Sequence, residues 1–222
     1  HIFDISVGTS DVSSLGALAT VQADKKDNIY NQMAQVLMGY DKDGNIQKFD
    51  EDGDLSGTGG TKINDAIFLS FSRLLVKDEI KKGSFDMKVG INNTFASPYG
   101  EIASIKDFGA DTSYRVNSPA GEYGILYMTN HVGSRVNGSP GATDRKCGLI
   151  YYQAGVVVLT SSIFIRTADG GFLTTNDSDM DLLGNHFDAM VTGSQISASA
   201  DAIRHRIQNI QFNNTIELNS TV

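Results

Sequence analysis

Two acidic loops follow one another between residues 40 and 55, and the spacing of their side chains suits a hard cation. Three oxygen-bearing side chains alternate in each loop: Asp41, Asp43 and Asn45 in the first, and Asp50, Asp52 and Asp54 in the second. Oxygen ligands alternate in this way at the start of a calcium loop. An EF-hand also needs glycine at position six and a bidentate carboxylate at position twelve, and neither loop has both. Calcium at Asp50, Asp52 and Asp54 is one interpretation of this stretch.

Turn chemistry is the other interpretation of the two loops, and it is the one we favour. An Asp side chain accepts a hydrogen bond from the backbone two residues further on, and the following Gly takes the left-handed conformation. Apolar or aromatic residues flank both loops, at Tyr40, Ile46, Phe49 and Leu55. Asp-Gly between such residues is typical of a hairpin, so we expect these four side chains to end short strands and pack inward.

The remaining reactive residues do not form a recognisable catalytic pattern. The sequence has no Gly-x-Ser-x-Gly elbow, and its four histidines are scattered: His1, His131, His186 and His205. Six carboxylates are available for glycoside hydrolysis, namely Glu101, Asp107, Asp111, Glu122, Asp179 and Asp181. That chemistry depends on the separation between two carboxylates, which a sequence does not give. The lone Cys147 has no second thiol to pair with, so we expect it to be a small buried apolar residue.

Composition excludes two classes of partner. The chain has 222 residues and a formal net charge of -8, whereas a nucleic-acid-binding surface needs clustered Lys and Arg. We therefore expect no nucleic-acid partner. Hydrophobic residues make up 40% of the chain, but no apolar run approaches the length of a membrane-spanning helix, so we expect no membrane partner.

Apolar periodicity predicts two amphipathic helices. The first covers residues 28–40, with Asp27 as its cap, Gly39 at its end, and an apolar stripe of Ile29, Met33, Val36, Leu37 and Tyr40. The second covers residues 200–212, with Ser199 as its cap and one buried side formed by Ile203, Ile207 and Ile210. Its other side, with Arg204, His205 and Arg206, is expected to be a solvated basic face.

Most of the remaining sequence is typical of strands. We expect strands in 66–75, 84–91, 122–129 and 171–175, a helical turn in 76–83 that Gly83 stops, and a hairpin in 148–164 hinged at residues 153–155. Near-continuous apolar runs lie buried on both faces, so the hairpin is expected at the centre of a sheet rather than donated to a neighbour. Its core residues are expected to be Tyr151, Tyr152, Val156, Val157, Val158 and Leu159. Long polar loops are expected in 52–62, 132–146 and 167–181.

These elements predict an α+β fold, a strand-dominated sheet scaffold with two amphipathic helices and long polar loops. We expect residues 1–222 to form a single structural domain. Because the chain opens on His1 rather than Met, we also expect it to be a fragment of a longer protein.

Five blocks of the sequence resemble the virion structural proteins of marine, cyanophage-like tailed phages with contractile tails. In chain order they are residues 29–55, 62–85, 123–130, 148–164 and 203–222, for example KINDAIFLSFSRLLVKDEIKKGSF and GLIYYQAGVVVLTSSIF. The resemblance implies a non-enzymatic, multi-copy assembly protein of the tail, baseplate or fibre-attachment region. Its implied partners are other virion proteins and copies of itself, with no catalytic residues to carry over and no cofactor apart from the calcium candidate.

Two alternatives stay open at this point. The first is a calcium-dependent, receptor-binding (adhesin-like) module of a tail fibre, for which the double acidic loop is the distinguishing feature. The second is an envelope polysaccharide hydrolase that uses two of the six carboxylates. The absence of Trp weakens the second alternative, because aromatic faces usually carry the stacking of sugar rings.

Overall fold

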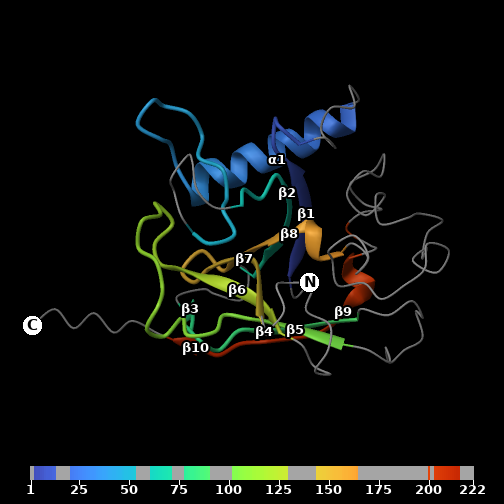
Figure 1. The fold of residues 1–222 in the computed structure, drawn as a ribbon, viewed down its shortest axis with the longest axis vertical. Coiled ribbons are helices and arrows are strands. Elements are labelled where there is room, and N and C mark those ends of the chain that lie inside the picture. The colour runs from blue at the N-terminus through green and yellow to red at the C-terminus, as the bar shows by residue number, and fades with distance from the viewer. Residues whose placement is uncertain are drawn as a thin grey trace, which may run out of the picture.

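An eight-stranded antiparallel sheet forms the body of the computed structural model (Figure 1). The structure describes residues 3–13, 21–53, 61–71, 78–90, 102–129, 144–164, 200 and 203–215. In spatial order the strands are β1 (Asp4–Thr9), β2 (Asp65–Ser70), β8 (Val156–Thr160), β7 (Asp144–Tyr151), β6 (Tyr123–Thr129), β5 (Ile102–Lys106), β4 (Asp86–Gly90) and β9 (Ile207–Gln211). A second, two-stranded sheet pairs β3 (Glu79–Ile80) with β10 (Asn214–Thr215). The expected strand-dominated α+β class is confirmed.

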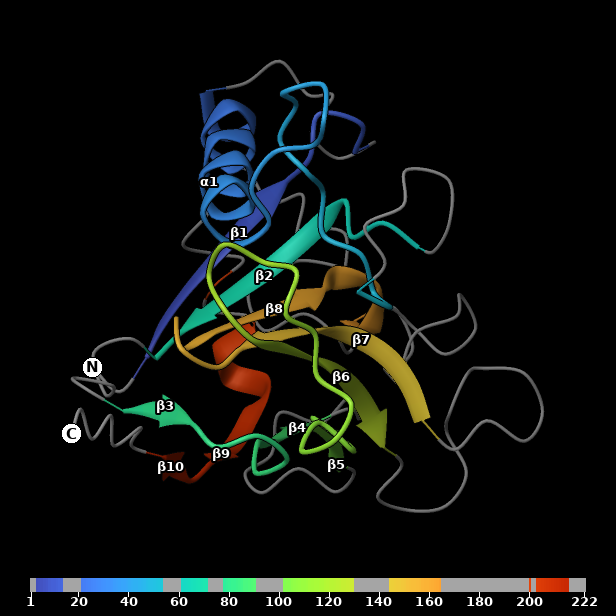
Figure 2. The same cartoon turned by 90° about the vertical axis from the view of Figure 1, so that its left-hand side faces the viewer.

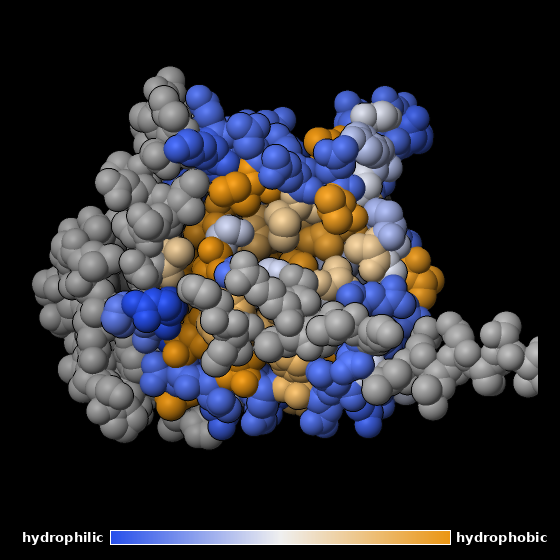
Figure 3. Space-filling model, turned by 180° about the vertical axis from the view of Figure 1, so that it is seen from behind, coloured by the Kyte–Doolittle hydropathy of each residue, from blue (hydrophilic) through white to orange (hydrophobic). Residues whose placement is uncertain are grey.

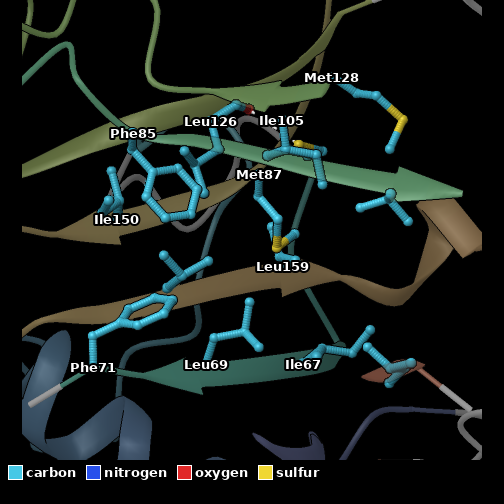
Figure 4. Packing of buried hydrophobic residues seen from close by; sticks show 14 of the residues in the cluster. Ile67, Leu69, Phe71, Phe85, Met87, Ile105, Leu126, Met128, Ile150 and Leu159 are labelled. Atoms are coloured by element: carbon cyan, nitrogen blue, oxygen red, sulfur yellow. Dashed lines mark hydrogen bonds between the residues drawn. The ribbon is translucent and has the colours of Figure 1, made fainter. Parts of the chain in front are cut away.

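The sheet curls, so that residues near its two ends come together. Phe71 directly follows β2 and Phe212 directly follows β9, and their ring centroids lie 5.4 Å apart. Side chains from both halves of the sheet meet inside this curl, as Figure 4 shows for Leu69, Met87 and Leu159. We call this buried group the inner cluster. It is the larger of the two cores that the described residues form.

The opposite face of the same strands carries the second core, which we call the helix-side cluster. It combines Tyr123, Leu149 and Val158 of the sheet with Tyr30 and Leu37 of helix α1 (Val21–Leu37). All five residues of β8 are buried, and its four apolar residues, 156–159, alternate between the two clusters, which explains the near-continuous apolar run in the sequence. The hairpin of β7 and β8 is central in the sheet, and its six predicted core residues are buried, as expected.

Helix α1 is longer than the sequence predicted, and it buries a different face. The helix already includes Val21, so Asp27 is not its cap. Asp27 lies in the middle of the helix, and its side chain accepts a hydrogen bond from the hydroxyl of Thr9. The helix does end before Gly39, whose φ is 78°. Figure 2 shows α1 beside β1, and the two pack closely, because a Cβ on Gly8 would lie 2.8 Å from the backbone nitrogen of Tyr30.

The predicted apolar stripe of this helix is only partly buried. Val36 is 64% exposed and Tyr40, beyond the helix, is 52% exposed, so both assignments to the core were wrong. Leu37 is buried, while Ile29 and Met33 only flank the helix-side cluster. The buried positions are Ala23, Lys26, Tyr30, Ala34 and Leu37. Alanines are only weakly hydrophobic, and the aliphatic stem of a Lys can lie along apolar surface, so a hydropathy pattern marks this face weakly.

The second predicted helix is mostly a strand. Residues 203–206 are helical, but the chain then becomes β9, which pairs with β4, so the helix prediction was wrong from Ile207 onward. The pairing shifts register between Lys88 and Val89, which leaves Gln208 as an extra, bulged residue. Because of this bulge, Ile207 and Ile210 both pack on the inner cluster. Ile207 and Ile210 therefore lie on one face although they are three residues apart, and this is the spacing that a helix would also give.

Two smaller differences concern loops. The predicted helical turn in 76–83 was wrong for its described part, where β3 leads into a turn at Lys82 and Gly83; Gly83 has a φ of 75°. The expected loop 132–146 ends earlier than predicted, since β7 starts at Asp144. Strand 171–175, loop 167–181 and the cap Ser199 lie outside the described residues.

No helix in the described ranges is long and apolar enough to cross a membrane.

Candidate functional site

The first acidic loop is a turn closed by its own aspartate. Asp41 Oδ1 accepts hydrogen bonds from the backbone nitrogens of Asp43, at 2.9 Å, and Asn45, at 2.8 Å. The hydrogen bonds from Asn45 are the main reason that the pKa of Asp41 is held below its ordinary value. Tyr40 and Ile46 form an antiparallel bridge across the loop. The turn interpretation is confirmed here, although Tyr40 ends the bridge as an exposed rather than a buried residue.

The second acidic loop is anchored in the same way, with a lysine added. The carboxylate of Asp50 is fully buried; its Oδ2 accepts a hydrogen bond from Lys62 Nζ at 2.6 Å, and its Oδ1 accepts one from the backbone nitrogen of Asp52 at 3.1 Å. Burial raises the pKa of Asp50. Gly53 takes a positive φ of 68°. Asp50 and Lys62 also form a backbone bridge, so the pair closes the loop between them.

The calcium assignment to Asp50, Asp52 and Asp54 stays a prediction. Asp54 lies outside the described residues, and Asp50 is already engaged by Lys62. Within the described ranges no group of three His, Cys, Asp or Glu side chains gathers as a metal site.

A polar groove of about 970 Å³ lies beside the first acidic loop and is also lined by Lys62, the partner of Asp50. Asn31 of α1, Asp43 and Asn45 of the first loop, and Asn64 before β2 contribute to its lining. We call this opening the polar groove. In its lining, Lys48 Nζ forms an ion pair with Asp11 Oδ1 at 2.6 Å. Its amides, carboxylates and ammonium groups suit a polar, hydrogen-bonding ligand.

The carboxylates considered for hydrolysis do not all lie in the described part of the chain, and the clearest of them is structural. Asp107 is buried and accepts hydrogen bonds from the backbone nitrogens of Gly83 and Phe85, at 2.7 and 3.0 Å, and from the hydroxyl of Tyr152 at 3.1 Å. Burial raises the pKa of Asp107 despite these donors. Its oxygens therefore hold the turn after β3 against the hairpin.

Two further candidates, Glu122 and Asp111, lie near the same turn at Lys82 and Gly83. Glu122 is in an ion pair with Lys82, and Asp111 is exposed. Glu101, Asp179 and Asp181 lie outside the described residues, as do His1, His131 and His186. His205 is exposed.

Cys147 and Arg206 are both fully buried, and only the cysteine was expected to be. Cys147 is buried in the inner cluster, as expected. Arg206 is fully buried and donates a hydrogen bond to the carbonyl oxygen of Gly90, so its assignment to a solvated basic face was wrong. Arg204 and His205 are exposed, as expected. The buried arginine ties the helical turn before β9 to the end of β4.

A second groove, of about 600 Å³, opens where the two ends of the sheet approach; we call it the edge groove. It is lined by Phe3, Phe71, Arg204 and the six consecutive residues 207–212. Side chains of a strand alternate between faces, so six consecutive lining residues mean that the edge of β9 itself borders the groove. Phe71 lies at the centre of an aromatic group, with ring centroids 5.7 Å from Phe3 and 5.4 Å from Phe212.

Sequence reasoning did not find the edge groove. Its three aromatic residues are far apart in the chain, and only the curl of the sheet brings them together. The run IQNIQF in 207–212, without a charged residue, was the available signal, but it was interpreted as a helix face.

Comparison of this chain with protein-family models, with curated proteins and with solved structures finds no match in any of the three.

Proposed function

We propose that this chain is a non-enzymatic structural protein of a contractile-tailed phage virion, and that it acts by docking to other tail or baseplate proteins and to copies of itself. The resemblance of the five sequence blocks motivates this proposal. The structural observation that carries it is the edge groove, where an edge strand and an aromatic group adjoin the same opening.

The distribution of apolar residues supports a docking role. Viewed from behind, apolar residues gather across the middle of the molecule, with hydrophilic residues above and below them (Figure 3). Apolar surface of this kind on the described residues is typical of interaction sites. By contrast, the best-placed buried carboxylate, Asp107, is occupied by three structural donors.

The test is the location of the chain in an intact particle. Particles of the phage that encodes it are purified by density gradient, analysed by mass spectrometry, and imaged by electron microscopy with an antibody against the chain. We expect several copies per particle and label on the tail region. Absence of the chain from gradient-purified particles, while it is abundant in the infected cell, would overturn the proposal.

A second candidate is a receptor-binding module, and the polar groove favours it. The first acidic loop lines this groove, and the amide oxygen of Gln47 in its lining is buried without a hydrogen-bond partner in the described part of the chain. Calorimetry with calcium, and melting with and without a chelator, test the calcium-dependent form of this candidate. No binding heat and no change in melting temperature would remove it.

A further inference from the structure

We propose that the polar groove binds a neutral saccharide, which is held by amide side chains while the ion pairs in the lining stay closed. This inference deepens the receptor-binding candidate by naming the class of ligand, and it rests on that candidate only for its biological purpose. Because the groove lies within one chain, its binding can be measured on the purified protein.

The lining of the groove comes from four segments that hydrogen bonds hold in place. The backbone nitrogen of Ser10, after β1, donates to the carbonyl oxygen of Asn64, before β2, at 2.7 Å. The hydroxyl of Tyr30, on α1, donates to the carbonyl oxygen of Ile63 at 2.6 Å and accepts from the backbone nitrogen of Phe49 at 3.3 Å. The first acidic loop is closed by its own aspartate. A site that is already ordered loses little affinity when a ligand binds.

The charges in the lining are balanced. Three aspartates and three lysines line the groove, although the chain as a whole carries a net charge of -8. Each of the three lysines is in an ion pair: Lys42 with Asp43 at 2.7 Å, Lys48 with Asp11 at 2.6 Å, and Lys62 with Asp50 at 2.6 Å. The lining therefore offers no excess charge of either sign to an ionic ligand, and an uncharged ligand leaves all three pairs closed.

Amide side chains supply the hydrogen bonds that a ligand can use. The amide oxygen of Gln47 is buried and has no hydrogen-bond partner in the described part of the chain. A donor from a ligand would remove the cost of this unsatisfied acceptor, and the last torsion of a Gln side chain turns easily enough to meet it. Asn64 uses its amide oxygen for the hydroxyl of Ser10, at 2.9 Å, so its amide nitrogen is the donor that can serve a ligand. Asn31 of α1 adds a third amide to the lining.

A hydroxyl group is the ligand group that suits this lining best. It donates and accepts at one atom, so neighbouring hydroxyls of a sugar ring can bond to an amide oxygen and to an amide nitrogen together. Val12, which is 61% exposed, and Ile46 add aliphatic surface for the C–H face of the ring. The volume of about 970 Å³ is at the upper end of the range of small-molecule sites, about 300 to 1,000 Å³, so the groove has room for more than one ring.

The aromatic residue in the lining is not placed to stack on a sugar. Tyr30 is 1% exposed, and its ring packs edge-on against Phe49 and Phe68. Aromatic faces usually supply much of the contact with an amphipathic ring, so we expect one copy to bind weakly, with a Kd of roughly 1 mM. Several copies on one particle would bind a cell surface far more tightly through their combined contacts.

The probe is a panel of defined trisaccharides. Four are neutral trimers, of glucose, galactose, mannose and N-acetylglucosamine; one is an anionic trimer of galacturonic acid, and one is a cationic trimer of glucosamine. Binding to the purified full chain is measured by NMR titration at about 0.05 and 0.5 M salt. We expect at least one neutral trimer to bind with a Kd that salt changes less than about twofold, and the charged trimers to bind about tenfold more weakly. Failure of all four neutral trimers to bind, or equally strong binding of a charged trimer, would overturn the inference.

Two substitutions test the amides without removing a contact inside the described chain that the fold is known to use. Gln47→Met keeps the length of the side chain and removes the buried acceptor, and Asn31→Ala removes an amide from α1 with a residue that favours helix. We expect each variant to weaken binding of the neutral trimer about five- to tenfold, while its melting temperature stays the same or rises. Gln153→Met is the matched control, because this exposed amide lies in the turn between β7 and β8, away from the lining. Wild-type affinity in the Gln47→Met variant would contradict the proposed role of this amide and overturn the inference.

The outcomes distinguish this inference from the proposed function. A chain that is found in the particle but binds no neutral trimer would refute saccharide binding and leave the docking role standing. A chain that binds a neutral trimer through Gln47 but is absent from particles would refute the virion proposal alone.

Discussion

Substitution of Val157 by Asp tests the central position of the hairpin most directly. Val157 is fully buried in β8, opposite Leu69 of β2 and Ile150 of β7, and it belongs to the inner cluster. Replacement removes about 2 kcal/mol of apolar burial, and an unpaired carboxyl group in its place costs roughly 2 to 7 kcal/mol more. The sum, about 4 to 9 kcal/mol, is comparable with the whole stability of a typical domain. We therefore expect Val157→Asp to prevent folding.

The chain offers a matched control for this change. Val36 carries the same side chain near the end of α1 but is 64% exposed. The Val36→Asp variant introduces the same charge, and we expect it to change the free energy of unfolding by no more than about 1 kcal/mol, partly through the unfavourable C-terminal end of the helix dipole.

The assay compares the soluble yield of the two variants and the wild type, and then their circular dichroism and urea unfolding. Insoluble or unfolded Val157→Asp protein beside a folded Val36→Asp protein is the expected outcome. A soluble Val157→Asp protein with a wild-type unfolding curve would refute the placement of this strand inside the sheet.

Two further substitutions probe packing and buried charge. Gly8→Ala is expected to lower the melting temperature, at a cost of about 1 to 3 kcal/mol, because its Cβ would lie 2.8 Å from the backbone of Tyr30; an unchanged melting temperature would argue against this close approach. Burial raises the pKa of Asp107 above its ordinary value of 3.8, so the stability linked to its protonation is lost as the pH rises through the folded pKa. The destabilisation caused by Asp107→Asn, measured by urea titration, should thus be largest in acid and shrink as the pH rises, whereas parallel pH profiles would contradict the raised pKa.

The hairpin and the acidic turns were predictable because their causes are local. The β-branched run on either side of Gly155 marks two strands and a reversal, and Gly155 has the expected positive φ of 63°. The backbone hydrogen bonds of Asp41 likewise join residues only two and four positions apart. In such segments the side chains that determine the conformation are neighbours in the sequence.

The region 203–212 was not predictable because pairing with β4 and a bulge decide its conformation. Apolar residues at 203, 207 and 210 fit a helix, and only the partner strand shows that Gln208 is an extra residue. The edge groove has the same origin, since Phe3, Phe71 and Phe212 meet through the curl of the sheet. The anchor of Asp50 by Lys62 also depends on contacts between residues twelve positions apart. These three features depend on contacts between residues that are distant in the sequence, and a pattern of apolar residues does not show such contacts.

The complete burial of β8 has a consequence for how the protein comes apart. Val157 and Val158 are adjacent in the backbone, yet one belongs to the inner cluster and the other to the helix-side cluster. Neither core can unfold without destabilising the other, because residues 156–159 of this one strand alternate between them. Thermal unfolding should therefore give one calorimetric peak without a populated intermediate. A substitution that destabilises the helix-side cluster should also destabilise β9, the edge strand at the far end of the sheet.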